Sequence, residues 1–496
     1  MTFFQLKGGW PKLWRAARLG ALLWLGLGMM AGQEARAQVP VVNTWNGTTS
    51  SDWFTASNWS AGVPASNSIV LINQTATQPV INGGNIHVNK LVLGFGPDND
   101  TVTLAMQGGQ VLTSGSLEIG KSPGTTGTVD VTSGNSIWNP GVIIVGEGGN
   151  GTLLISNGAV VNATLVTGVV PPGSMVSAYA TYIGYGAMGN LTVTGLGSAL
   201  SLSGNAAGVA VGNFEGGNGV LNITNGGQVT NGPAVLAFAV NSTGTALISG
   251  AGSGWTATQL QVGNFGAGNL TVASGGLVSV AQGVVVAQTA GSTGVVNLNG
   301  GTLQAGSTIQ VNGNGTLQGT GQLNGSVVIN SGGVIAPGTA GPLMVGAGNV
   351  ALGGTGNVTL GGAANFEFAD ATHYSQLDLL GSGAVLGYRG NLTLDFDVVV
   401  SSFWTDDLFS FANGSETGDF ANVDLGGVYS GALSDNGGVW TGEDGNVTFT
   451  FNTATGDLTT ASVVPEPGAW GMVIGSVVAL VVGGRRIRQK VAGGKV

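Results

Sequence analysis

The sequence predicts an all-β protein: a parallel β-solenoid of the right-handed β-helix type, with a C-terminal β cap and a single C-terminal transmembrane helix. Three observations support this fold class. Glycine supplies 93 of the 496 residues and hydrophobic residues supply 43%, while charged residues make up only 7%. A short pattern of glycine followed by alternating apolar and polar residues recurs along the middle of the chain. An almost uncharged apolar segment lies near the C-terminus, between a Pro-Glu-Pro motif and a basic cluster.

Residues 1–37 are typical of a secretory signal peptide. A basic region is followed by a short apolar segment over residues 19–31. Ala35, Arg36 and Ala37 form a small-x-small cleavage site, which makes Gln38 the first residue of the mature chain. The alternative is an uncleaved anchor helix, for which the apolar segment is short. We therefore expect the protein to be exported.

Residues 38–100 are expected to form a Trp-rich N-terminal cap and the first coils. Trp45, Trp53 and Trp59 follow one another closely in a region rich in Asn, Ser and Gly. Two roles fit these indoles: a platform on which carbohydrate stacks, or a plug over the open apolar end of a solenoid. An uncovered end is an edge that invites aggregation, and this favours the plug.

Residues 101–349 form the Gly-rich repeat region. Each repeat begins at a glycine, continues as a strand with period-two alternation, and ends in a Gly- or Asn-rich turn. The repeats begin at Gly127, Gly151, Gly189, Gly219, Gly244, Gly268, Gly294 and Gly315. Such short units bury their apolar rows only against neighbouring repeats, which predicts a solenoid. A β-sandwich or a propeller built from the same strands is the alternative.

Residues 350–462 are expected to form a C-terminal β cap. Acidic and aromatic residues, which are scarce in the repeats, return here in segments such as 395–397 and 403–411. This change of composition indicates that the regular repeat gives way to a different structure that closes the solenoid.

Residues 463–496 carry a sorting-like segment. Val464-Pro465-Glu466-Pro467 ends any preceding strand, because proline lacks a backbone donor. Residues 468–484 are just long enough to cross a bilayer as a helix. The basic residues that follow are expected to hold this end on the cytoplasmic side of an inner membrane. They are Arg485, Arg486, Arg488 and Lys490.

This order of motif, apolar helix and basic tail resembles the PEP-CTERM sorting signal of Gram-negative bacteria. The resemblance implies that an exosortase, a membrane transpeptidase, recognises Pro465, Glu466 and Pro467 and processes the segment during export. The alternative is a plain single-pass anchor. The resemblance also implies an organism that makes extracellular polysaccharide. Sorting segments of this type also occur on proteins described as ice-binding.

Two regions resemble autotransporter passengers and PEP-CTERM-associated repeat proteins. The first is the Trp-rich start, with Trp45-Asn46-Gly47, Asn58-Trp59-Ser60 and Gly62-Val63-Pro64. The second is the stretch around residues 315–338, followed by Phe366-Glu367-Phe368. The resemblance implies a β-helical passenger architecture.

No catalytic residues, metal site or cofactor are predicted. Between Gly148 and Asn365 the only charged residue is Glu215, so no acid–base pair can be assembled there. Cysteine is absent, which excludes thiolate chemistry. Asp98–Asp100 and Asp406-Asp407 lack the spaced ligands of a calcium loop and are interpreted as solvated turn carboxylates. The scarcity of Lys and Arg between the two terminal segments excludes nucleic acid as a partner.

Three functional hypotheses follow. The first is an exported, envelope-sorted structural or adhesive surface protein that associates with extracellular polysaccharide or biofilm matrix and is not an enzyme. The second is a β-helix polysaccharide lyase or hydrolase, which a groove with three or more converging Asp, Lys, Arg or His residues would favour. The third is an ice- or surface-binding protein, which would need threonines at one register in successive repeats.

Overall fold

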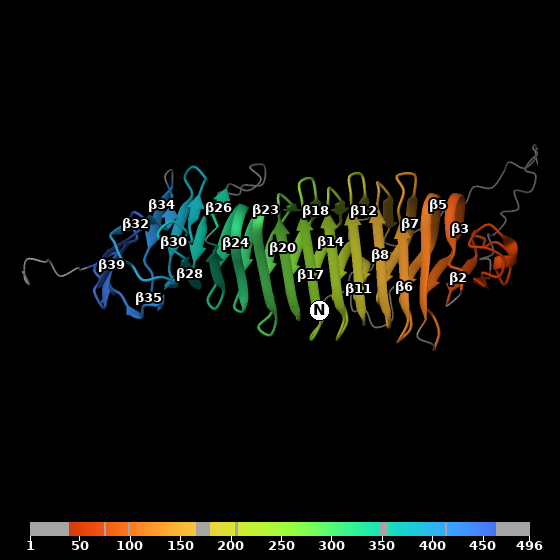
Figure 1. Ribbon diagram of the computed structural model, residues 1–496, viewed down its shortest axis with the longest axis horizontal. Coiled ribbons are helices and arrows are strands. Elements are labelled where there is room, and N and C mark those ends of the chain that lie inside the picture. Colours follow the sequence, from red (N-terminus) through yellow and green to blue (C-terminus); the bar gives the residue numbers. More distant parts are fainter. Residues whose placement is uncertain are drawn as a thin grey trace, which may run out of the picture. The chain divides into compact units, whose positions relative to one another are not determined.

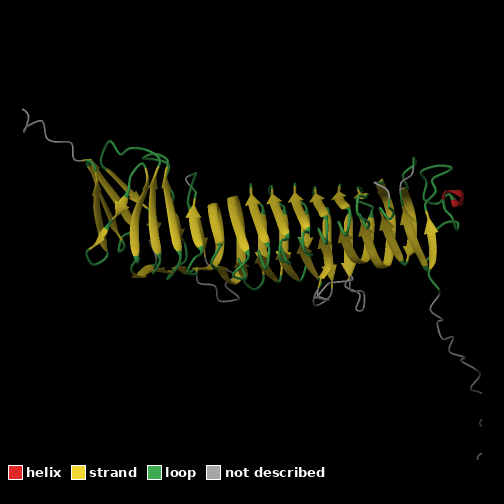
Figure 2. Ribbon diagram, turned by 90° about the horizontal axis from the view of Figure 1, so that it is seen from below, coloured by secondary structure: helices red, strands yellow, loops and turns green. Residues whose placement is uncertain are grey.

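The strands of this protein wind into a stack of parallel coils. The computed structural model describes residues 39–73, 76–97, 100–164, 179–203, 207–338, 340–346, 356–411 and 414–462. In this part of the chain, 35 strands join into one sheet, and its long-range pairings are parallel (Figure 1). Each coil lies directly on the next (Figure 2). The predicted parallel solenoid and its repeat are therefore confirmed, in place of a sandwich or propeller.

Each coil contributes strands to three faces, which we call A, B and C in chain order. Face A contains β6 (Thr126–Val131), β8 (Asn150–Ser156), β11 (Met188–Thr194), β14 (Asn218–Thr224), β17 (Thr243–Ser249), β20 (Ala267–Ala273), β25 (Val334–Pro337), β28 (Ala363–Phe368), β31 (Asn391–Phe396) and β35 (Asn422–Gly427). Face B contains β9 (Val160–Thr164), β12 (Ala199–Ser203), β15 (Gln228–Thr230), β18 (Gly254–Ala257), β21 (Leu277–Val280), β26 (Leu343–Gly346), β29 (Leu377–Leu379) and β33 (Phe409–Ser410).

Face C completes each coil. It contains β1 (Val41–Thr44), β2 (Ser68–Ile72), β4 (Lys90–Leu93), β10 (Tyr179–Ile183), β13 (Gly208–Val211), β16 (Pro233–Leu236), β19 (Gln259–Val262), β22 (Val284–Val286), β27 (Val358–Leu360), β30 (Val385–Tyr388) and β34 (Ser415–Gly418). Several longer strands turn a corner and serve more than one face. These are β3 (Val80–Val88), β5 (Thr101–Ile119), β7 (Ile137–Val145), β23 (Thr293–Val311) and β24 (Gly315–Ile329).

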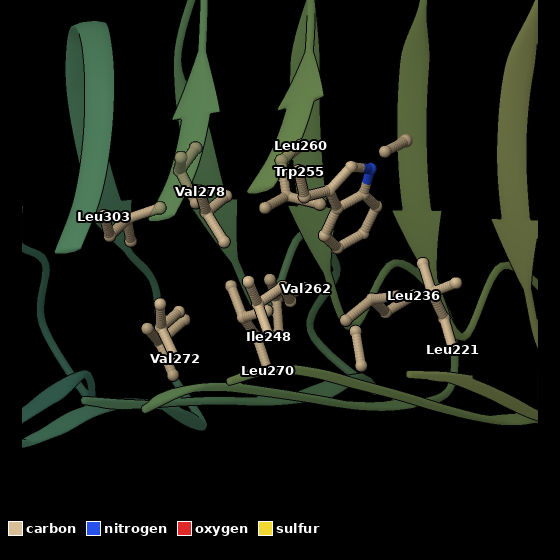
Figure 3. Packing of buried hydrophobic residues seen from close by; sticks show 14 of the residues in the cluster. Leu221, Leu236, Ile248, Trp255, Leu260, Val262, Leu270, Val272, Val278 and Leu303 are labelled. Atoms are coloured by element: carbon tan, nitrogen blue, oxygen red, sulfur yellow. The ribbon is translucent and has the colours of Figure 1, made fainter. Parts of the chain in front are cut away.

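The glycines that open the predicted repeats stand in one register on face A. The residue two positions after each glycine points inward and forms a continuous apolar row, in which every side chain is fully buried. The row consists of Leu104, Val129, Leu153, Leu191, Leu221, Ala246, Leu270, Val296, Leu317, Ile335, Ala364, Leu392 and Val423. Similar rows from faces B and C meet it in the interior, where Trp255, Val262 and Leu270 come from the three faces (Figure 3).

A tight corner joins face C to face A in each coil. Gly184 turns this corner with φ of 68°, and its N–H donates to the carbonyl of Val145 in the preceding coil at 2.7 Å. Gly189, which opens the next strand, lies so close that a Cβ atom there would be 2.3 Å from the Val145 carbonyl oxygen. Glycine is favoured at both positions because the backbones approach closely and the first residue has a positive φ, although two other coils carry Ala237 and Ala287 at the first position. The same pairing recurs at Gly146 with Gly151, Gly212 with Gly219, and Gly263 with Gly268.

A separate antiparallel sheet covers the C-terminal coils. Its strands are ordered β32 (Trp404–Asp407), β40 (Asp457–Ser462), β39 (Val447–Asn452), β38 (Val439–Asp444) and β37 (Ser434–Asp435), and β36 (Gly431–Ala432) pairs with β35. Phe449 and Phe451 of β39 are fully buried, and their rings lie 5.3 Å from Phe396 and 5.9 Å from Phe409. The parallel coils continue to β35, beyond residue 349, where the sequence predicted the cap to begin.

The predicted fold class included a single C-terminal transmembrane helix, and that part is corrected. No helix in the described ranges is long and apolar enough to span a membrane, and the described helix is the short 3-10 turn η1 (Ala56–Asn58). The described apolar segments are short strands, and continuous apolar runs such as residues 142–145 of β7 are far shorter than a spanning helix needs. The predicted segment, residues 468–484, lies outside the described residues. The described residues form an all-β fold that does not include this helix.

The corner column allows a direct test of backbone strain. Ala237 and Ala287 occupy it with φ of 58° and 56°, a region that favours glycine. We expect Ala237→Gly to stabilise the protein by roughly 0.5–1 kcal/mol, because it removes the strain of a Cβ at positive φ. Gly212→Ala should destabilise it by about 1–3 kcal/mol, since the new Cβ would lie 2.2 Å from the Thr243 carbonyl oxygen. Thermal unfolding followed by circular dichroism measures both, and a lower Tm for Ala237→Gly would contradict this account.

Candidate functional site

The three N-terminal tryptophans form an end plug. Trp45, Trp53 and Trp59 are 2%, 1% and 4% exposed. Trp59 lies edge-on between the other two, with ring centroids 4.8 Å from Trp45 and 4.6 Å from Trp53. The Trp59 indole donates to the Trp53 carbonyl at 2.7 Å, and the Trp45 indole donates to the Thr77 carbonyl at 2.8 Å. No ring face is open, so these residues cannot serve as a carbohydrate platform.

A buried asparagine fixes the loop that carries the plug. Asn58 is fully buried, and its side-chain oxygen accepts hydrogen bonds from the N–H groups of Thr49 and Ser50 at 2.9 and 3.0 Å. Its amide donates to the Asp52 carbonyl at 3.0 Å. Because every polar group of this side chain has a partner, the loop folds over the first coils without an unsatisfied amide.

The outer surface of face B carries a row of uncharged hydrogen-bonding side chains. Its members lie on successive coils and are half-buried or exposed. They are Asn139, Asn162, Ser201, Thr230, Thr256, Ser279, Gln304 and Asn324. Each member stands about 4.8 Å from the next, the spacing of paired strands. We call this the polar row. It presents hydroxyl and amide groups at a constant interval without a single charge.

The polar row was not predicted from the sequence. Asn162 follows Gly151 at the same distance along the chain as Thr230 follows Gly219, but Ser201 and Gln304 stand at other distances from Gly189 and Gly294. Alignment of the repeats on their opening glycines therefore does not place the polar residues in one column, and the strand register is needed to find the row. Face A has no comparable row of threonines, because its first outward column mixes three residue types. That column is Thr128, Thr152, Asn190, Val220, Thr245, Asn269, Val295 and Thr316.

Two groups of charged side chains lie on the outside of the coils, apart from the acidic residues of the C-terminal sheet. On the outside of face C, Lys90 contacts Glu118 at 2.6 Å, and Lys121 bridges Glu118 and Glu147. Burial alone would raise the pKa of Glu118, but its hydrogen bond and ion pair with Lys90, together with Lys121, lower it. These groups neutralise one another, so the network is a structural element and not a source of free charge.

The second charged region borders a cleft of about 330 Å³ on face A. Glu367 and Asp395, on the neighbouring strands β28 and β31, line it together with amide side chains of Asn297, Gln318 and Asn365. Burial raises the pKa of Glu367, and the carboxylate of Asp397 adds to the effect. The lining contains two acidic groups and no Lys, Arg or His. With Asp397, which hydrogen-bonds to Glu367, three carboxylates lie close together at this place.

Asp406 and Asp407 are strand residues, and the expectation of solvated turn carboxylates is wrong for them. They lie in β32, paired with Leu458 and Asp457 of β40. Asp406 is 5% exposed, and one of its carboxylate oxygens has no hydrogen-bond partner in the described structure. Burial raises the pKa of Asp406 to about 6. Within the described residues, no three His, Asp or Glu side chains are grouped to hold a metal ion.

The sorting and cleavage residues lie outside the described residues. These are Ala35, Ala37 and Gln38 at the predicted cleavage site, and Val464, Pro465, Glu466, Pro467, Arg485, Arg486 and Arg488 in the predicted sorting segment. Asp98 and Asn99 of the other acidic segment are also outside them.

No protein-family model matches this sequence, and no similar sequence was found among curated proteins.

The stability of tryptophan variants distinguishes an end plug from a carbohydrate-binding platform. Trp53→Ala should lower stability by about 3–5 kcal/mol, because it opens a large cavity at the end of the solenoid. Phe54→Ala is the matched control. Phe54 follows Trp53 in the chain, but its side chain is 41% exposed, so its removal should change stability little. Chemical denaturation followed by tryptophan fluorescence measures both variants. Equal, small effects would mean that the tryptophans do not act as a plug.

The buried carboxyl of Asp406 predicts a pH dependence of stability. Its folded pKa of about 6 lies above the ordinary 3.8, so the stabilisation of the neutral acid is fully present below about pH 3.8. It is lost as the pH rises through about 6. At pH 7, Asp406→Asn should therefore raise stability by roughly 2 kcal/mol and flatten this part of the pH profile. Asp424→Asn on β35 is the control, and an unchanged profile in the Asp406 variant would contradict the assignment.

Proposed function

We propose that this protein is an exported, non-catalytic structural or adhesive surface protein that associates with extracellular polysaccharide or biofilm matrix. The observation that carries the proposal is the polar row on face B. A linear polymer of neutral sugars presents hydroxyl groups along its length, and a straight column of hydroxyl and amide groups offers matching donors and acceptors. The lack of charge beside the row favours contact with a neutral polymer over a polyanion.

The proposal includes export and sorting at the cell envelope. The N-terminal segment supports export through a cleaved signal peptide before Gln38. The motif Pro465-Glu466-Pro467 supports recognition by an exosortase-type transpeptidase of a Gram-negative bacterium. Mass spectrometry of the mature protein tests both parts. A mature chain that begins at Gln38 and ends near Pro467 is expected, and intact ends would contradict this part of the proposal.

The polar row leads to a binding prediction. Native electrophoresis in gels that contain hydroxyethylcellulose, dextran or galactomannan should retard the protein, whereas alginate should not. The combined variant Thr230→Ala, Thr256→Ala, Ser279→Ala should bind about tenfold more weakly, since three hydrogen-bonding groups are lost. The control variant Thr192→Ala, Thr245→Ala, Thr271→Ala removes three outward hydroxyls from face A. High salt should leave binding unchanged, because no ion pairs contribute. Failure to bind any neutral polymer would overturn the proposal.

The cleft beside Glu367 gives the enzyme hypothesis a definite test. A hydrolase with two carboxylates would release reducing ends from one of these polymers. We expect no release by the purified protein. Release that disappears in Glu367→Gln but persists in Asp424→Asn would replace the structural proposal by a hydrolase.

A further inference from the structure

The corner between faces C and A carries a second, aromatic surface. Two of the corners are built from the same tripeptide, Gly212-Asn213-Phe214 and Gly263-Asn264-Phe265. Phe214 and Phe265 are 44% and 45% exposed. The two tripeptides are separated by one intervening coil, which turns the same corner at Ala237. The exposed rings therefore stand about 10 Å apart along the stack, two strand spacings.

Each exposed ring is supported by an aromatic ring from the preceding coil. Tyr185 stacks on Phe214 with ring centroids 5.6 Å apart and an interplanar angle of 18°. Phe238 meets Phe265 edge to face at 6.4 Å. Aromatic pairs of this kind hold their rings in place. Phe214 and Phe265 are thus fixed rings with one side open, and not freely rotating surface residues.

A nearly buried amide accompanies each exposed ring. Asn213 and Asn264 are 6% and 9% exposed. Their backbone N–H groups donate to the carbonyls of Gly184 and Ala237, but within the described structure neither side-chain amide makes a hydrogen bond. Neither amide is among the fully buried polar atoms of the described residues that lack a partner, so their polar atoms still reach solvent. These amides are therefore available to bond with a ligand that offers hydroxyl groups beside the ring.

The corner thus repeats one unit every two coils: a supporting ring, an unpartnered amide and an exposed ring. The units are Tyr185 with Asn213 and Phe214, and Phe238 with Asn264 and Phe265. Sugars combine an apolar ring face, which packs on an aromatic ring, with hydroxyl groups that bond to amides. Two carboxylates lie beside the units: Glu215 is exposed, and Glu147, which pairs with Lys121, lies near Tyr185. Acidic groups at this place disfavour an anionic polymer.

We infer that this corner binds a neutral glycan chain that lies along the stack of coils. Phe214 and Phe265 stack on two sugar rings of the chain, and Asn213 and Asn264 bond to their hydroxyl groups. The two-coil spacing is of the order of a disaccharide, so an extended β-linked chain presents the same ring face to both units. This inference rests on the proposed association with polysaccharide and adds the corner, as a second contact surface, to the polar row on face B.

The test compares variants of the full chain in the same affinity gels. The combined variant Phe214→Ala, Phe265→Ala should bind neutral polymer at least about tenfold more weakly, and Asn213→Ala, Asn264→Ala should also bind more weakly. Phe214→Tyr, Phe265→Tyr should retain binding, because the ring face remains. Phe95→Ala is the matched control, since Phe95 follows Gly94 at the same corner of an earlier coil and is 46% exposed. Circular dichroism confirms that each variant is folded.

The outcomes separate this inference from the proposed function. If the wild type binds a neutral polymer and the double phenylalanine variant binds equally well, the corner is not the binding surface and the proposed function stands. If the wild type binds none of the neutral polymers, both fail. Light scattering of the same samples measures their oligomeric state. A change of oligomeric state in the phenylalanine variant, with unchanged glycan binding, would assign the corner to contact with a second copy and overturn the inference.

Discussion

The close approach of two backbone segments at the corner between faces C and A is the constraint on which the rest of the structure depends. At this corner the chain reverses direction with almost no space, and the next strand starts against it. Gly184 and Gly189 illustrate the consequence, because a side chain at either position would collide with backbone. The corner holds successive coils in one register. Register in turn determines that every second residue of face A enters the interior.

This register explains the composition of the chain. Most coils have two glycines at this corner, which contributes to the glycine content, whereas two coils carry Ala237 and Ala287 at its first position. The inner rows require Val, Leu and Ile at fixed positions, so the hydrophobic fraction is high in spite of the many glycines. The outer positions face solvent, so any hydrophilic residue fits there. Here they are mostly Asn, Thr, Ser and Gln. Charges of one sign that are stacked along a column repel each other, and in the described coils Glu367 and Asp395 form such a pair near the C-terminal end.

The same stacking that stabilises the coils creates the functional surfaces. A side chain at one outward position is repeated at the strand spacing on every coil, so small differences between repeats become extended surface features. The polar row on face B and the ring-and-amide units at the C–A corner are two such features. The ends of the stack are the weak points, because they expose edges and apolar cross-sections. The buried tryptophans close one end, and the antiparallel sheet with Phe449 and Phe451 closes the other.

The sequence by itself favoured the parallel solenoid over a sandwich or propeller, because units that begin at a recurring glycine and alternate with period two bury their apolar rows only against neighbouring repeats. The sequence left Trp45, Trp53 and Trp59 open between an end plug and a carbohydrate platform, and the burial of their rings came only from the tertiary structure. The tertiary structure decided what depends on alignment across coils. Thr230 and Thr256 are far apart in the chain and become neighbours only when register is known. The local sequence around Asp406 is typical of a polar turn, yet the pairing of β32 with β40 buries its side chain. Burial and lateral neighbours come from contacts between distant segments, and a local pattern of residues does not contain them.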